Sequence, residues 1–128
     1  MNKRIILTAA FFGMIAVVLG AFGAHGLSGR INEQGLDNWH TAVNYQFYHT
    51  FALLFLATFS RAKNTLINLS YFSFTIGILF FSGSLYLLST RELTGINAVH
   101  VLGPITPLGG IALIIGWGSL FLATLKGR

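Results

Sequence analysis

The sequence predicts an all-α fold: a four-helix transmembrane bundle with antiparallel neighbours, formed by one domain of 128 residues. Hydrophobic residues make up 54% of the chain and charged residues 9%, whereas soluble domains carry about 25% charged residues. The charges also leave four long uncharged windows, at residues 5–29, 38–60, 64–90 and 93–125. A bilayer core needs about 20 apolar residues of helix, so each window holds one span.

The basic residues indicate how the chain is oriented in the membrane. Six of them lie on one side of the four windows: Lys3, Arg4, Arg61, Lys63, Lys126 and Arg128. The other side has two basic residues and all three acids: Arg30, Arg91, Glu33, Asp37 and Glu92. The positive-inside rule therefore predicts that both termini are cytoplasmic. Because no basic patch forms on a soluble face, the net charge of +5 does not indicate nucleic-acid binding.

The first helix, expected over about residues 5–27, has one face of small residues at spacings of three and four. They are Ala9, Gly13, Ala16, Gly20 and Ala24. Small residues let helix backbones approach closely in lipid. We therefore expect this face to pack against another helix.

The second helix is expected over about residues 39–59, after a polar external loop at 28–38, and it is the polar one. Tyr45, Gln46 and His49 share one of its faces. His49 lies about 15 Å past Trp39 along the helix, close to the membrane centre. A lipid-facing position would be costly there, so the three side chains are expected to point into the bundle, toward residues 13–20 or Ser84, with His49 neutral.

The third and fourth helices are expected over about residues 67–88 and 107–125. Gly77 in the third, and Gly109 and Gly116 in the fourth, are expected at close helix contacts. Pro107 suits the first turn of the fourth helix, with Thr106 as its N-cap.

Four motifs together resemble a known family. They are GAFGAHGL (20–27), YQFYH (45–49), FSGSLY (81–86), and TPLGG with GW (106–110 and 116–117). The chain resembles domain-of-unknown-function family 423, the small membrane proteins that include transmembrane protein 256. The resemblance implies a four-helix, multi-pass protein of the bacterial inner membrane, and it implies no activity.

The four histidines are His25, His40, His49 and His100, and they do not form a recognisable metal motif. No HxxxH or HExxH spacing occurs, so we expect no metal site. His25 and His49 differ in depth by about 10 Å, which fits haem ligation poorly. The chain has no cysteine, and no serine is placed beside a base by its spacing. We therefore expect no cofactor and no enzymatic activity.

Three functions remain open at this point. The favoured one is a non-enzymatic structural or accessory membrane subunit, with membrane lipid around it and a homo-oligomer or larger membrane complex as its partner. The second is a lipid-, quinone- or cofactor-binding accessory protein that uses the polar residues of the second helix. Its binding residues would be His25, Tyr45, Gln46, His49 and Ser84. The third is a small transporter or channel subunit, which would need a polar path through both halves of the membrane.

Overall fold

A computed structural model describes residues 2–59 and 65–126, and all regular structure in these ranges is helical. The described residues form four long continuous helices, which we call rods. The first rod joins α1 (Lys3–Phe22) to a π-helical segment, η1 (Gly23–Leu27). The second is α2 (Glu33–Phe59). The third joins α3 (Thr65–Gly77), a second π-helical segment η2 (Ile78–Ser82), and α4 (Gly83–Ser89). A short α5 (Arg91–Thr94) precedes the last rod, α6 (Val99–Leu125).

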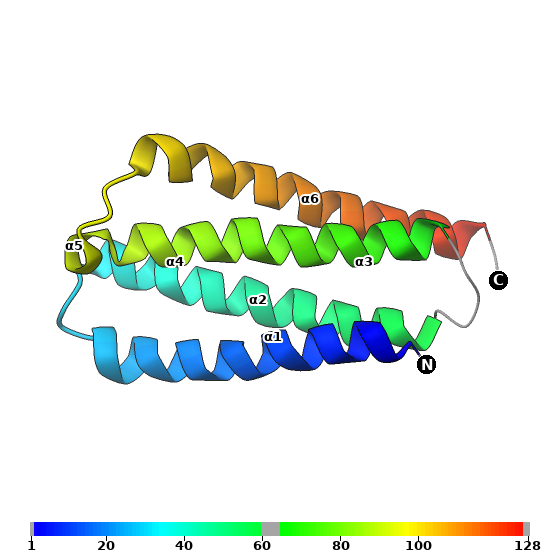
Figure 1. The fold of residues 1–128 in the computed structure, drawn as a ribbon, viewed down its shortest axis with the longest axis horizontal. Helices are drawn as coiled ribbons and strands as arrows, with labels where there is room; N and C mark the ends of the chain where they lie inside the picture. Colours follow the sequence, from blue (N-terminus) through cyan, green and yellow to red (C-terminus); the bar gives the residue numbers. More distant parts are fainter. Residues whose placement is uncertain (1, 60–64, 127–128) are drawn as a thin grey trace.

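The long helices lie side by side (Figure 1). Helix α1 packs on α2, α2 packs on η2 and α4, and α3 with η2 packs on α6. The start of α1 and the end of α6 lie at the same end of the molecule, and α5 lies at the opposite end (Figure 1). We call the end of the molecule at which α5 lies the α5 end. One apolar core joins α1, α2, α3 and α6, and it includes Ile5, Leu53, Phe74 and Leu113.

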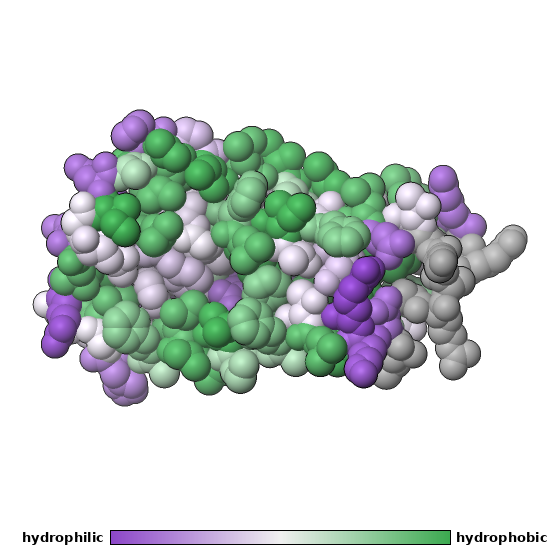
Figure 2. All heavy atoms as spheres, in the orientation of Figure 1, coloured by the Kyte–Doolittle hydropathy of each residue, from purple (hydrophilic) through white to green (hydrophobic). Residues whose placement is uncertain are grey.

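Three of the rods are long and apolar enough to cross a membrane: Lys3–Leu27, Thr65–Ser89 and Val99–Leu125. On the face drawn in Figure 2, apolar residues cover much of the surface, and strongly hydrophilic residues gather toward the two ends. Helix α2 contains too many polar residues to qualify by composition. The structure is therefore all-helical with three candidate spans, and α2 needs a separate argument.

Helix α2 begins at Glu33 rather than near Trp39 as expected from the sequence. The side-chain oxygen of Asn32 accepts a hydrogen bond from the Gly35 backbone N–H at 2.7 Å. This is the interaction by which asparagine starts a helix. The polar residues taken for a loop are thus the exposed first turns of a helix, and the expected loop over 28–38 shortens to 28–32.

Helix α6 begins at Val99, and the expected start at Pro107 with Thr106 as N-cap is wrong. Pro104 and Pro107 both lie inside the helix. The Thr106 hydroxyl donates to the Leu102 carbonyl at 3.3 Å, one turn back in the same helix. Membrane helices tolerate internal proline because neighbouring groups replace the lost backbone bonds. Proline was therefore a poor marker of where this helix starts.

The small residues of α1 line its contact with α2. Ala9 and Ala16 are fully buried. A Cβ added at Gly13 or Gly20 would lie 3.5 Å from Thr50 or Val43, which is ordinary van der Waals contact. Ala24 is exposed and does not belong to this face.

The tightest helix contact lies between α6 and the third rod. A Cβ added at Gly109 would overlap the backbone of Phe81 and lie 2.8 Å from the carbonyl carbon of Phe80. Added at Gly116, it would lie 2.6 Å from the Phe74 ring, and at Gly77, 2.7 Å from the Leu113 side chain. These three glycines therefore allow α6 to approach α3 and η2 closely.

Gly109→Ala should destabilise the protein by about 1–3 kcal/mol, because the new methyl group meets backbone that cannot move aside by a rotamer change. Gly20→Ala is the matched control. It should change stability by no more than about 0.5 kcal/mol, because its contact is with a side chain at ordinary distance. Thermal unfolding in mild detergent measures both. Equal unfolding temperatures for the two variants would contradict the assignment of the tightest contact.

Candidate functional site

Gln46 lies where three helices meet. Its side chain is 3% exposed. The Gln46 amide nitrogen donates to the backbone carbonyl of Phe12 in α1 at 2.8 Å. Its amide oxygen accepts from the hydroxyl of Tyr86 in α4 at 2.6 Å. The expectation that Gln46 points into the bundle toward the first helix agrees with this geometry, and Tyr86 adds a link to the third rod.

His49 also points inward, but toward α6 rather than α1. Its ring is 5% exposed. His49 Nδ1 lies 2.7 Å from the Tyr45 carbonyl, and the Trp117 indole N–H donates to His49 Nε2 at 3.0 Å. A carbonyl only accepts and an indole N–H only donates. The ring therefore carries its proton on Nδ1 and is neutral.

Tyr45 contacts His49 from the edge of α2, with ring centroids 6.0 Å apart, whereas Ser84 forms hydrogen bonds with other residues. The Tyr45 side chain is 39% exposed, and its ring stacks on Phe81 with centroids 4.6 Å apart. The expectation that Tyr45 points into the bundle is therefore wrong: it lies at the edge of α2, against the third rod. Ser84 shares a hydrogen bond with Thr106 of α6 and also donates to the Phe81 carbonyl at 3.0 Å.

Two serines outside the set of candidate binding residues form further links between helices. The Ser82 hydroxyl in η2 donates to the Ala42 carbonyl of α2 at 2.7 Å. The Ser70 hydroxyl in α3 donates to the Gly116 carbonyl of α6 at 2.8 Å. Both serines are buried. In the sequence, each of these serines stands out only as a hydroxyl group inside an uncharged window. The carbonyl that each hydroxyl binds could not be predicted, because it depends on how the helices pack.

The remaining candidates stand apart from these links. His25 lies exposed in η1. Thr50, buried on α2, has the one buried side-chain oxygen in the described residues that lacks a hydrogen-bond partner. Across residues 2–59 and 65–126, no three His, Asp or Glu side chains are grouped to hold a metal ion. Arg61, Lys63 and Arg128 lie outside the described residues.

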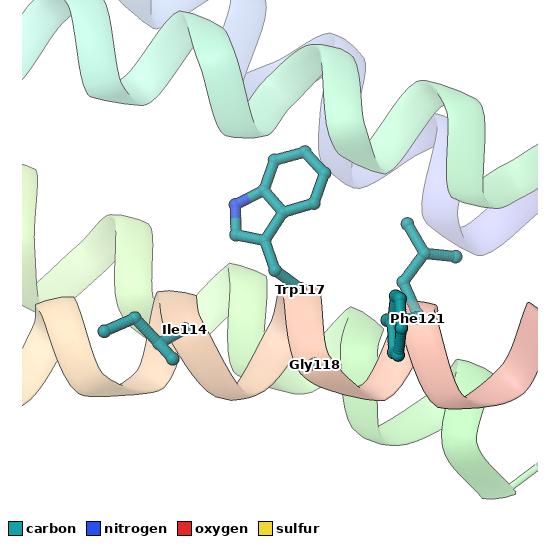
Figure 3. A pocket seen from close by; sticks show the side chains of 5 residues that line it. Ile114, Trp117, Gly118 and Phe121 are labelled. Atoms are coloured by element: carbon teal, nitrogen blue, oxygen red, sulfur yellow. The ribbon is translucent and has the colours of Figure 1, made fainter.

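A hollow of about 520 Å³ lies beside Trp117 on α6, lined by Ile114, Gly118, Leu120 and Phe121 (Figure 3). The indole of Trp117 projects from α6 toward α2 in this view (Figure 3). The other lining side chains are aliphatic or aromatic, so the hollow offers no acid, base or nucleophile.

The His49–Trp117 contact should be measurable as a coupling energy. His49→Phe and Trp117→Phe each remove the hydrogen bond while keeping an aromatic ring. The double-mutant cycle should give a coupling of about 0.6 kcal/mol, the average for hydrogen bonds between membrane helices. A cycle of Tyr48→Phe with Trp117→Phe is the control and should give none, because Tyr48 is exposed on α2. A zero coupling for the first pair would contradict the assigned contact.

The chain matches known proteins over nearly its whole length. The family model described as "Protein of unknown function (DUF423)" matches residues 19–110. A UPF0382 membrane protein of Staphylococcus aureus is 44% identical over 124 residues, covering 97% of each chain. The UPF0382 membrane protein YwdK of Bacillus subtilis is 42% identical over 127 residues, covering 97% of this chain and 98% of its own.

No solved structure matches the chain. The family model covers well over half of the sequence, and the relatives share its full extent. The resemblance seen in the four sequence motifs is therefore confirmed, and the relatives' names describe membrane proteins. The chain belongs to the DUF423 family of proteins of unknown function.

Proposed function

We propose that the chain is a four-span, multi-pass protein of the bacterial inner membrane, with α2 as the fourth span and both termini in the cytoplasm. Its role is that of a non-enzymatic structural or accessory subunit, which works as a homo-oligomer or within a larger membrane complex. The observation that carries this proposal is how the polar side chains of α2 are used.

Two of those polar side chains, Gln46 and His49, are buried and hydrogen-bonded to other helices. Gln46 links α1 and α4, and His49 links α2 to α6. In hydrocarbon, an unpaired polar group costs several kcal/mol. A side chain already engaged with two partners is poorly suited to bind or transform a substrate. This geometry favours a structural role for the polar cluster over a ligand site formed by Tyr45, Gln46 and His49.

The outward side of α2 suits a lipid environment over its second half. From Tyr45 to the end of the helix, the large exposed side chains are aromatic or aliphatic: Tyr45, Tyr48, Phe51, Leu54, Phe55 and Phe59. Most of its exposed polar residues lie in the first turns, at the α5 end, while Asn44 is exposed just before Tyr45 and Thr58 is exposed near the other end. The low mean hydropathy of α2 thus comes from its inward face and its first turns. This distribution supports α2 as a span.

The charges of the described residues support the orientation. Lys3, Arg4 and Lys126 flank the end where α1 begins and α6 ends. The α5 end has two basic residues, Arg30 and Arg91, beside three acids, Glu33, Asp37 and Glu92. An excess of basic residues marks the cytoplasmic side, so the α5 end faces outward.

The transporter alternative receives less support. The stretch of α2 that follows His49 toward the cytoplasmic end is Thr50–Phe59, and apart from two threonines its side chains are apolar. A transport path needs polar or ionisable groups through both halves of the membrane. In that half of the described residues, the hydroxyls of Thr8 and Tyr71 bond to each other and the Ser70 hydroxyl donates to the Gly116 carbonyl, so these polar groups link helices.

A reporter fused after Arg128 should be active only in its cytoplasmic form, because the basic residues keep that end inside. A fusion within the loop after η1, at Ser28, should give the opposite pattern and serves as the control. Periplasmic activity of the fusion after Arg128 would overturn the orientation.

The accessory role predicts a protein partner. After purification of the tagged chain in mild detergent, we expect it to migrate as an oligomer or with another membrane protein. A monomer that purifies alone, after cross-linking in intact membranes, would argue against this role. His49→Gln should lower the unfolding temperature without releasing a bound molecule, because the side chain acts as a link between helices.

A further inference from the structure

A groove runs along the molecule between α1 and α4, with α2 as its floor. Its outer part is a hollow of about 370 Å³ at the α5 end, lined by Phe22, Trp39, Leu87 and Leu93 among others. Its inner part is a hollow of about 260 Å³, lined by Phe12, Ile15, Gln46 and Leu79 among others. Tyr86 lines both hollows, so the two adjoin at this residue, and we call them together the groove.

The groove offers almost no free polar group. The Tyr86 hydroxyl donates a hydrogen bond to the Gln46 amide oxygen, so neither group is free. The hydroxyl of Thr90 donates to the Tyr86 carbonyl at 2.9 Å, and that of Thr94 donates to the Thr90 carbonyl at 3.2 Å. The indole N–H of Trp39 donates to the Leu19 carbonyl at 2.8 Å. The groove therefore selects a hydrocarbon occupant rather than a polar headgroup.

The groove has the depth of one membrane leaflet. Its inner part reaches Gln46, the middle residue of α2, and Ile78, next to the middle of the span Thr65–Ser89. Its outer part ends at Leu93 and Thr94 of α5. From Ile78 to Thr90 the rod rises about 18 Å, and half of a bilayer core is about 15 Å. The groove thus extends from the membrane centre to its outer surface.

The size of the groove argues against a helix of a second copy as the occupant. A helix segment 18 Å long and 10 Å wide fills about 1,400 Å³. The two hollows hold about 370 and 260 Å³. A single flexible hydrocarbon chain is much narrower than a helix and needs no hydrogen bonds, so it suits two adjoining hollows of this size.

We propose that this groove binds one acyl chain of a phospholipid from the outer leaflet, with its ester and headgroup at α5 and its methyl end near Gln46. The bound acyl chain fills the gap between α1 and α4. Because the lining contacts only hydrocarbon, binding depends on the acyl chain and not on the headgroup. The proposal rests on the proposed arrangement of the spans and on the α5 end facing outward, and it does not depend on the accessory role.

Gly83 provides the test. It lines the inner hollow, and a Cβ added there meets no atom within 4 Å. Gly83→Leu should therefore fill the groove without disturbing the helices. Gly103→Leu is the matched control, because an added Cβ also meets nothing there and Gly103 of α6 lies outside the groove lining.

The experiment compares the wild-type chain and both variants after purification in mild detergent with palmitoyl-oleoyl phosphatidylglycerol, by native mass spectrometry. We expect one retained phospholipid on the wild type and on Gly103→Leu. On Gly83→Leu, we expect the retained amount to fall by a factor of about ten or more. Adding the lipid should raise the unfolding temperature of the wild type but not of Gly83→Leu. Phosphatidylethanolamine with the same chains should behave identically.

Several outcomes would overturn the proposal. They are a wild type that retains no phospholipid, equal retention by Gly83→Leu, or a strong preference for one headgroup. A lipid-free dimer that Gly83→Leu dissociates would assign the groove to a second copy instead. Circular dichroism of Gly83→Leu checks that the helices are intact, so a loss of lipid cannot be mistaken for unfolding.

Discussion

The hydrogen bonds of Gln46 join α2 to two other helices, and the arrangement of the bundle depends on this connection. In hydrocarbon a buried amide must find partners within the protein. Gln46 finds them on α1 and α4, through the Phe12 carbonyl and the Tyr86 hydroxyl. His49 extends the same principle to α6 through Trp117. Helix α2 is thus connected to every other long rod, and its polarity is the means of connection.

This arrangement determines what the outer surface and the packing can look like. Because Gln46 and His49 are buried, apolar side chains can cover much of the face drawn in Figure 2. Because hydrocarbon gives no hydrophobic drive between helices, close packing must add to the polar links. Gly109 allows such close packing where α6 meets Phe80 and Phe81. The α1–α4 side lacks such a close contact, and the groove opens there.

The sequence was most informative about the helices themselves. Uncharged windows in the sequence correspond to the long rods, because charge is excluded from hydrocarbon whatever the packing. Helix boundaries were less predictable. Asn32 starts α2 within a polar stretch that reads as a loop, and two prolines lie inside α6. The start of α2 follows a local capping signal that the surrounding polar residues obscure, whereas α6 tolerates its prolines because neighbouring groups replace the lost backbone bonds.

The candidate site was predictable only in part, for a geometric reason. Spacing along α2 places Gln46 and His49 on one face. It cannot reveal that Trp117 reaches His49, because that depends on how α6 is rotated and shifted against α2. The same uncertainty hid the links of Ser70 and Ser82. Tyr45 shares the helical face but lies at its edge, where a difference of a few tens of degrees decides between burial and exposure.

The central claim is that α2 crosses the membrane with its polar face turned inward. Because the chain has no cysteine, single-cysteine variants along α2 can test it with a membrane-impermeant thiol reagent. Gln34→Cys should react from the outer side only, while Phe51→Cys and Phe55→Cys should stay unreactive from both sides. Ready reaction at Phe51→Cys or Phe55→Cys in intact membranes would contradict the account.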